Sequence, residues 1–278
     1  MNCIQTDAAE LIEIIFQDYK IHPVDLIGLD DSIGEFNYIS NHKEEYKRTI
    51  FDINDLFKQK DKSQIRIVEI GSYLGVVSIA LSKMGYNMTA ADLDIFMQNK
   101  NLQNKLEGNN INFRSIDLKY PIPLPDASFD CVVMCETLEH LNFNPIPVLH
   151  EINRLLIPGG YIYLALPNLC SLENRFKLLS GKSIHNSIDD FFDQLNPNCN
   201  FSAGLHWREY QKDEIVYLLS KTGFEVIKHS FFHPWDLIKL PIKFYIRSLW
   251  GRRNFIYIIK RLYPSLKSSQ TVICRKSI

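Results

Sequence analysis

Three side chains that can do chemistry stand close together in the segment MCETLEHL, residues 134–141. Glu136, Glu139 and His140 follow one another at intervals that place them on one face if the segment is helical. Two carboxylates and an imidazole can hold a divalent metal ion, and the imidazole can act as a general base near neutral pH. A structural interpretation also stands, with Glu139 in solvent and His140 packed beneath a pocket.

The elements that must position this segment are strands alternating with helices. From residue 65 onward, short apolar runs are separated by stretches with helical spacing, and the run before Glu136 is apolar on both faces. This alternation predicts an α/β fold with a seven-stranded, mostly parallel sheet flanked by helices. The predicted strands are 65–70, 87–92, 111–117, 129–135, 161–168, 224–232 and 270–276.

The first part of the chain has a different pattern. Residues 1–64 are predicted to be a helical N-terminal extension, with helices at 4–20 and 40–62, and residues 65–278 form the α/β domain. We expect the two extra helices to pack on the core of the α/β domain.

The composition sets limits on the class of protein. The 278 residues carry a net charge of −1, which gives no global attraction to nucleic acid or membrane. The six cysteines include no C-x-x-C pair, as is typical of a reducing compartment. The acidic N-terminus does not resemble a signal peptide, and no run of about 18 uncharged apolar residues exists. We therefore expect a cytoplasmic protein.

Acidic residues and glycines follow the first three predicted strands. Ligands of open parallel sheets bind at the carboxyl ends of the strands, where Glu69, Gly71 and Gly75 follow the first strand. Glycines allow the backbone to approach a ligand closely. Asp92 ends the second strand and can accept hydrogen bonds from both ribose hydroxyls, while Asp117 after the third can accept from an adenine amine. Together these residues predict a nucleoside site.

The turn after the first strand departs from the dinucleotide pattern G-x-G-x-x-G. Tyr73 and Val76 occupy the positions of its second and third glycines. A close approach of a pyrophosphate is therefore disfavoured, and a nucleoside without phosphates fits better.

Four segments together resemble the successive motifs of class I S-adenosylmethionine-dependent methyltransferases. The resemblance is in particular to the small-molecule and glycan enzymes of types 11 and 12 in this family. The segments are VEIGSYLG, AADLD, SIDLKYPIPLPDASFDCVVMCETLEHL and LHEINRLLIPGGYIYLALPN. The resemblance spans residues 65–170 and implies a Rossmann-like fold with S-adenosyl-L-methionine as cofactor.

The resemblance also implies roles for individual residues. Glu69 would face the methionine amino group, Asp92 would hold the ribose, and Asp117 would flank the adenine. Cys135 and Glu136 would lie beside the transferred methyl group. Tyr73 stands where the family has a glycine, so its side chain must cover the cofactor or point away from it. The implied cofactor-binding residues are Glu69, Gly71, Ser72, Tyr73, Gly75, Asp92, Leu93, Asp117, Leu118 and Cys135.

The pattern E-x-x-E-H at residues 136–140 resembles two metal-dependent groups, the O-methyltransferases of ubiquinone biosynthesis and the small-RNA 2′-O-methyltransferases. The resemblance implies a Mg²⁺-type ion held by Glu136, Glu139 and His140, which would acidify an acceptor hydroxyl. His206 is the candidate for a further ligand. For catalysis itself we single out His140, as a general base, and Glu136.

The expected function is O-methylation of a small molecule, glycan or lipid-linked intermediate. The alternatives are a metal-dependent RNA 2′-O-methyltransferase, which the near-neutral charge does not favour, and a non-catalytic protein that binds the cofactor. Residues 168–206 are predicted to form a lid over the acceptor. Residues 237–268 contain eight Lys or Arg and no acid. This composition suits peripheral contact with an anionic membrane or binding of a phosphorylated acceptor, and it also suits a helical insertion packed on the sheet edge with its lysines in solvent.

Overall fold

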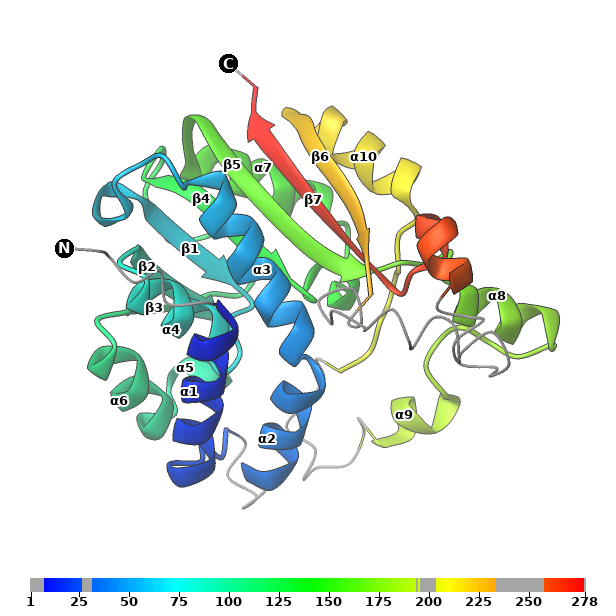
Figure 1. Cartoon of the computed structure of the whole chain (residues 1–278), viewed down its shortest axis with the longest axis horizontal. Helices are drawn as coiled ribbons and strands as arrows, with labels where there is room; N and C mark the ends of the chain where they lie inside the picture. The colour runs from blue at the N-terminus through cyan, green and yellow to red at the C-terminus, as the bar shows by residue number, and fades with distance from the viewer. Residues whose placement is uncertain (1–7, 27–31, 194, 196–203, 234–257, 278) are drawn as a thin grey trace.

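A computed structural model of the chain (Figure 1) describes residues 8–26, 32–193, 195, 204–233 and 258–277. Its strands are β1 (Arg66–Ile70), β2 (Asn87–Asp92), β3 (Asn112–Ser115), β4 (Phe129–Cys135), β5 (Leu156–Pro167), β6 (Phe224–Phe232) and β7 (Ser269–Lys276). They form one seven-stranded sheet in the order β3-β2-β1-β4-β5-β7-β6. β7 is antiparallel to both neighbours and the other pairs are parallel. The predicted fold class is confirmed.

The helices differ from the prediction in the N-terminal extension. They are α1 (Ala8–Ile21), α2 (Ser32–Asn41), α3 (Lys43–Leu56), α4 (Val76–Lys83), α5 (Asp94–Met97), α6 (Lys100–Gly108), α7 (Ile146–Leu155), α8 (Leu172–Leu179), α9 (Ile188–Asp193) and α10 (Lys212–Lys221). The single helix predicted at 40–62 is wrong, because the chain turns at His42 between α2 and α3 and α3 ends at Leu56. The polar stretch after β2 divides because the Asn99 side chain accepts from the Leu102 N–H and starts α6.

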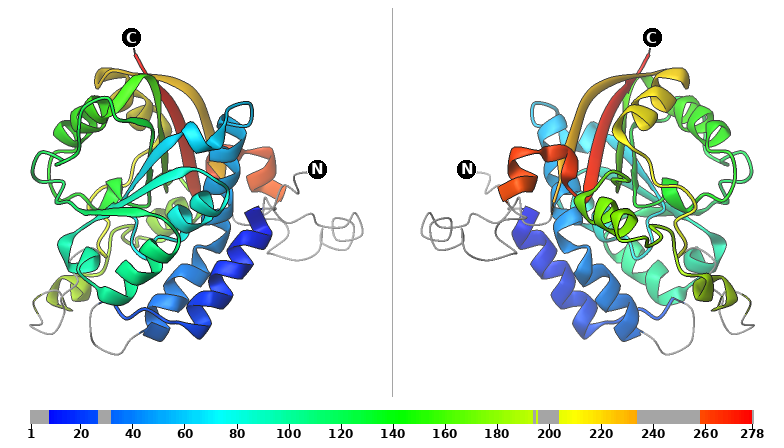
Figure 2. Two further views of the ribbon diagram at one scale, coloured as in Figure 1. Left: turned by 90° about the vertical axis from the view of Figure 1, so that its left-hand side faces the viewer. Right: turned by 90° about the vertical axis from the view of Figure 1, so that its right-hand side faces the viewer.

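Alternate side chains of the central strands enter two separate hydrophobic clusters, one on each face of the sheet. Ile67 of β1 belongs to the cluster that α1, α3 and α4 cover. Its neighbour Val68 belongs to the cluster that α7 and α10 cover. Figure 2 shows the blue N-terminal helices on one side of the sheet and α7 on the other. This two-sided burial accounts for the apolar character of β4 on both faces.

The N-terminal helices share a core with the sheet. Ile12 and Ile15 of α1 and Ile53 of α3 are buried in the same cluster as Ile67. The hydroxyl of Tyr19, also in α1, donates a hydrogen bond to the carbonyl of Leu74, in the turn that follows β1. The first helix therefore supports the turn that begins α4.

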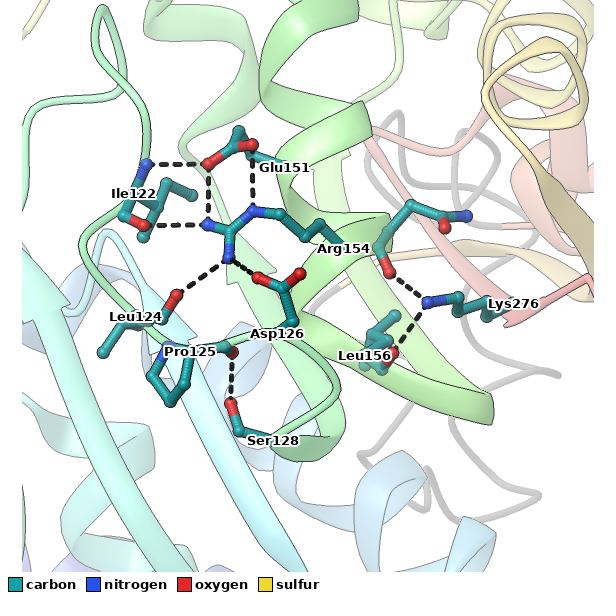
Figure 3. Close-up of polar contacts among 10 residues, drawn as sticks. Ile122, Leu124, Pro125, Asp126, Ser128, Glu151, Arg154, Leu156 and Lys276 are labelled. Carbon is teal, nitrogen blue, oxygen red and sulfur yellow. Dashed lines mark hydrogen bonds and ion pairs between the residues drawn. The ribbon is translucent and has the colours of Figure 1, made fainter.

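Arg154 of α7 holds the loop that leads into β4 (Figure 3). Its guanidinium donates to the carbonyls of Ile122 and Leu124 at 2.8 and 2.9 Å. It also pairs with Glu151 at 2.8 Å and Asp126 at 2.5 Å. Most of these contacts satisfy backbone and neighbouring acids, so they fix the loop PIPLPDAS as a structural connection.

The predicted basic insertion, residues 237–268, lies partly outside the described residues, which resume at 258. Lys260, in the helical segment 258–262, is buried and pairs with Glu173 of α8 at 2.5 Å. Within the described part of the chain, no helix combines the length and the apolar composition needed to cross a membrane.

Candidate active site

A cavity of about 640 Å³ opens at the carboxyl ends of β1, β2 and β4. Its walls come from the turn after β1, the ends of β2 and β4, the segment after β3, and α2. The predicted site residues that line it are Gly71, Tyr73, Asp92, Leu93, Asp117, Leu118, Glu136, His140 and His206. The fold thus brings most of the predicted residues to one place.

The turn after β1 requires glycine at its first position. Gly71 has φ of +75°, and a Cβ atom there would lie 2.2 Å from Oγ1 of Thr137. A side chain is therefore excluded both by the backbone conformation and by the segment after β4. Gly71 donates its N–H to the Ala91 carbonyl at 2.9 Å, which joins the turn to β2.

Asp92 is held by the backbone of the same turn. Its carboxylate accepts from the N–H of Tyr73 and from that of Leu93, both at 2.7 Å. Burial nevertheless raises the pKa of Asp92 to about 6. Each carboxylate oxygen can accept a further hydrogen bond, and Asp92 lines the cavity, which suits a ligand with two adjacent hydroxyls.

Other predicted cofactor residues lie behind the cavity wall. Glu69 is buried and accepts from Ser78 Oγ at 2.5 Å and from the Ser78 N–H at 2.9 Å, at the start of α4. Burial raises the pKa of Glu69 to about 8. The sulfur of Cys135 lies 3.5 Å from Thr49 Oγ1 of α3. Ser72 is buried. These residues support the turn or pack against α3 instead of lining the cavity.

The aromatic ring of Tyr73 covers one wall of the cavity together with two other rings. Its centroid lies 5.2 Å from that of Tyr38 in α2 and 5.7 Å from that of Phe96 in α5, both edge-to-face. The sequence prediction missed α2, which supplies Gly34 and Tyr38 to the cavity, and His42, at the turn between α2 and α3, lines it as well. The spacing of four between Gly34 and Tyr38 was the available signal, since it places these two residues on one helix face.

The segment after β4 is not the helix that its spacing predicts. β4 ends at Cys135, Glu136 has φ of +46°, and a single 3-10 turn covers Leu138–His140. The N–H of Glu136 donates to the Ala165 carbonyl of β5 at 2.8 Å, so the chain leaves the sheet only after this residue. The interpretation that placed Glu139 in solvent is wrong, because Glu139 is fully buried.

Glu139 has an unusual environment for a buried carboxyl group. No N–H or O–H donor among the described residues reaches either of its oxygens. Burial, and next the nearby carboxylate of Glu136, raise the pKa of Glu139 well above its ordinary value. Burial also raises the pKa of Glu136. A hydrogen bond between two carboxyl groups requires a proton, and a bound cation satisfies both groups without one.

Two histidines complete a group with Glu139. One ligand atom each from Glu139, His140 and His206 lie within 4.8 Å of one another. Nδ1 of His140 lies 3.0 Å from the Leu205 carbonyl. In this contact the Nδ1–H donates, so Nε2 carries no proton and its lone pair is free to bind a metal. Burial, followed by His206, lowers the pKa of His140 to about 4, so the ring is neutral at neutral pH. This donor set fits a divalent metal ion.

The order of the sheet and the position of the cavity define the class I S-adenosylmethionine-dependent methyltransferase fold. A family model described as a methyltransferase domain matches residues 42–229, more than half of the chain. The chain therefore belongs to this methyltransferase family.

Two curated relatives show what the chain is similar to. The ubiquinone biosynthesis O-methyltransferase of Colwellia psychrerythraea is 27% identical over 127 residues, which are 45% of this chain and 51% of the relative. A probable S-adenosylmethionine-dependent methyltransferase of Mycolicibacterium smegmatis is 33% identical over 105 residues, 38% of this chain and 32% of the relative. The chain thus spans about half or less of the length of these relatives.

Solved structures agree on the fold. A chain from the complex of the Haloferax volcanii Trm112 methyltransferase activator with a methyltransferase has a TM-score of 0.61 and 15% identity, covering 92% of this chain and 99% of that one. A SAM-dependent methyltransferase from Archaeoglobus fulgidus has a TM-score of 0.52 and 18% identity, covering 86% and 99%.

Proposed function

We propose that this protein transfers the methyl group of S-adenosylmethionine to a hydroxyl oxygen, with a divalent metal ion beside the acceptor. The acceptor is a small molecule, a glycan or a lipid-linked intermediate. The observation that carries the proposal is the Glu139–His140–His206 group at the edge of the cavity, in which Glu139 is fully buried and the two histidines are half-buried. The names of the curated O-methyltransferase relatives support oxygen as the acceptor atom.

The cofactor fits the part of the cavity between β1 and β2. Gly71 lines this part of the cavity, and without a side chain its backbone can approach the cofactor closely. Asp92 would accept from the ribose hydroxyls, and Asp117 and Leu118 would flank the adenine. Tyr73 would cover the cofactor from the side of α2. S-adenosylmethionine supplies an electrophilic methyl group when it is bound there.

The metal ion fits because the structure leaves a buried carboxylate without donors. Glu139, His140 and His206 would hold the ion. Two imidazoles in a set of three favour Mn²⁺, Fe²⁺ or Zn²⁺ over the Mg²⁺ that the sequence suggested, because Mg²⁺ prefers an all-oxygen shell. A bound metal ion lowers the pKa of a hydroxyl next to it.

Proton transfer then falls to Glu136 instead of His140. The low pKa of His140 makes it a weak base near neutral pH but a suitable neutral ligand. Glu136 lines the cavity, and burial raises its pKa toward the range of a general base. We assign Glu136 to accept the acceptor's proton as the oxygen attacks the methyl carbon and the bond from carbon to sulfur breaks.

The test is methyl transfer from radiolabelled S-adenosylmethionine to a panel of catechols and sugar diols. Activity is measured with Mn²⁺, with Mg²⁺ and with EDTA. We expect transfer that EDTA abolishes and that Mn²⁺ restores better than Mg²⁺. Glu139→Gln is expected to lose metal-dependent transfer but to keep cofactor affinity, and Asp92→Ala to lose cofactor affinity in calorimetry.

Three outcomes count against separate parts of the proposal. Transfer at the full rate in EDTA would remove the metal from it. Label on a carbon atom of an accepted compound, instead of on an oxygen, would remove the oxygen preference. A folded wild-type protein that does not bind S-adenosylmethionine would overturn the enzymatic function altogether.

A further inference from the structure

His206 has a carboxylate partner, Glu209, that is not a member of the Glu139–His140–His206 group. Its Nδ1 lies 3.1 Å from Oε1 of Glu209. A carboxylate at Nδ1 fixes the proton on that nitrogen and leaves Nε2 as a lone pair. In metal sites, such a carboxylate orients the ring and increases its basicity as a ligand.

Glu209 is itself held in place. Its other oxygen, Oε2, accepts from Nδ2 of Asn174 at 3.0 Å. Asn174 lies on α8, is 8% exposed, and also donates to the Leu169 carbonyl at 3.1 Å. Both carboxylate oxygens of Glu209 thus have a fixed partner, which is more than a simple ion pair with a histidine requires.

The geometry points to Glu209 as the positioning residue of the metal ligand His206, with Asn174 holding Glu209. The inference rests on the metal site of the proposed function and adds to it a residue outside the ligand group. It also gives residues 168–206 a role apart from covering an acceptor. Asn174 of α8 holds Glu209, and Glu209 in turn holds His206.

Further contacts join the earlier part of the same insertion to His206 and to its neighbour Trp207. The N–H of His206 donates to Oδ1 of Asn186 at 2.9 Å, between α8 and α9. The ring of Trp207, the next residue, lies 5.6 Å from that of Phe191 in α9. Because these contacts hold His206 in place, a metal ion that binds only the held form of His206 would also stabilise the docked insertion.

The experiment is a titration with Mn²⁺ alone, followed by electron paramagnetic resonance, with a parallel calorimetric titration with S-adenosylmethionine. We expect Glu209→Ala to weaken Mn²⁺ binding by about 10- to 100-fold. Glu209→Gln is expected to be intermediate, because its amide oxygen still accepts from Nδ1 but lacks the charge. Asn174→Ala is expected to lose less than Glu209→Ala.

The matched control is Glu225→Gln. Glu225 is an exposed carboxylate on β6 that pairs with Arg275 at 2.6 Å, so this variant makes the same change in net charge away from the site. Its Mn²⁺ affinity should equal that of the wild type. Unchanged affinity for S-adenosylmethionine in the Glu209 variants would show that they keep the fold.

A second readout is the rate of limited proteolysis within residues 168–193. Mn²⁺ should slow cleavage of the wild type and have a smaller effect on Glu209→Ala. If Glu209→Ala binds Mn²⁺ as tightly as the wild type, the inference is overturned and the metal site stands. If the wild type binds no Mn²⁺, both are overturned, while the cofactor titration still tests the methyltransferase function by itself.

Discussion

Asp92 and Glu139 are both buried carboxyl groups, but their surroundings give them different chemistry. Asp92 accepts two backbone N–H groups, and its pKa of about 6 leaves it ionised at neutral pH. Glu139 has a second carboxyl group, Glu136, as its neighbour, and burial together with that carboxylate raises the pKa of Glu139 well above its ordinary value. Asp92 is therefore ready to accept hydrogen bonds from a ligand, whereas Glu139 requires a cation to ionise.

At this scale the affinity for S-adenosylmethionine is expected to depend on pH through Asp92. The ionised carboxylate is the better acceptor for ribose hydroxyls, so a proton competes with the ligand. Above pH of about 6 the dissociation constant should be level. Below it, the constant should rise by up to about tenfold per pH unit. Calorimetry between pH 5 and about 8 measures this, and Asp92→Asn should bind weakly with no such slope.

A slope of equal size in Asp92→Asn would assign the pH dependence to another group.

Gly71→Ala is expected to damage both stability and binding. The added methyl group meets Thr137. The positive φ lowers the stability of the folded state by a further ~1–3 kcal/mol. We expect the free energy of unfolding to fall by at least about 2 kcal/mol and cofactor binding to be lost. Gly108→Ala is the control, since a Cβ atom at Gly108 has no neighbour within 4 Å. Urea denaturation of both variants decides, and equal stability would contradict the close packing at Gly71.

At the scale of elements, α1 belongs to the core of the sheet domain as firmly as α4 does. Ile12 is fully buried, whereas Ile14, two residues later on the same helix, is 49% exposed. Their burial follows from helical spacing, which turns the two side chains to different faces. A helix attached only loosely to the domain would show no such difference between them.

Ile12→Ala is expected to lower the free energy of unfolding by about 2–5 kcal/mol. Ile14→Ala should change it by no more than about 0.5 kcal/mol. Urea denaturation followed by circular dichroism compares the two variants. Equal effects, or a separate early transition in Ile12→Ala alone, would indicate that α1 folds apart from the sheet.

The segment after β4 shows why spacing alone misassigned an element. Offsets of three and four are compatible with a helix, but they do not exclude a tight turn. Here the chain leaves β4 through a positive φ at Glu136, a rare backbone conformation for a glutamate. The pairing of its N–H with Ala165 of β5 decides this conformation, and that contact is not visible in the local sequence.

On the scale of the whole molecule, the sequence was enough for whatever depends on local pattern. Apolar runs gave the seven strands, and the acids after them marked the cavity edge, including Asp92 and Asp117. What it could not give depends on contacts between distant segments. The burial of Glu139 and the placement of Tyr38 over Tyr73 are examples. His206, which the sequence analysis named as a candidate ligand, does lie beside His140.

The strand order also has a consequence for synthesis. β5 pairs with β7, and in the described sheet β6 pairs with β7 alone. A ribosome makes β6 well before β7, so during translation β6 has an unpaired backbone and no neighbour to join. In that interval the helices made earlier, such as α1, α3, α4 and α7, can already pack on the faces of β1 to β5. In the nascent chain β6 therefore stays unpaired until β7 has been made. During this interval β6 is the strand that a chaperone for exposed strand edges would bind.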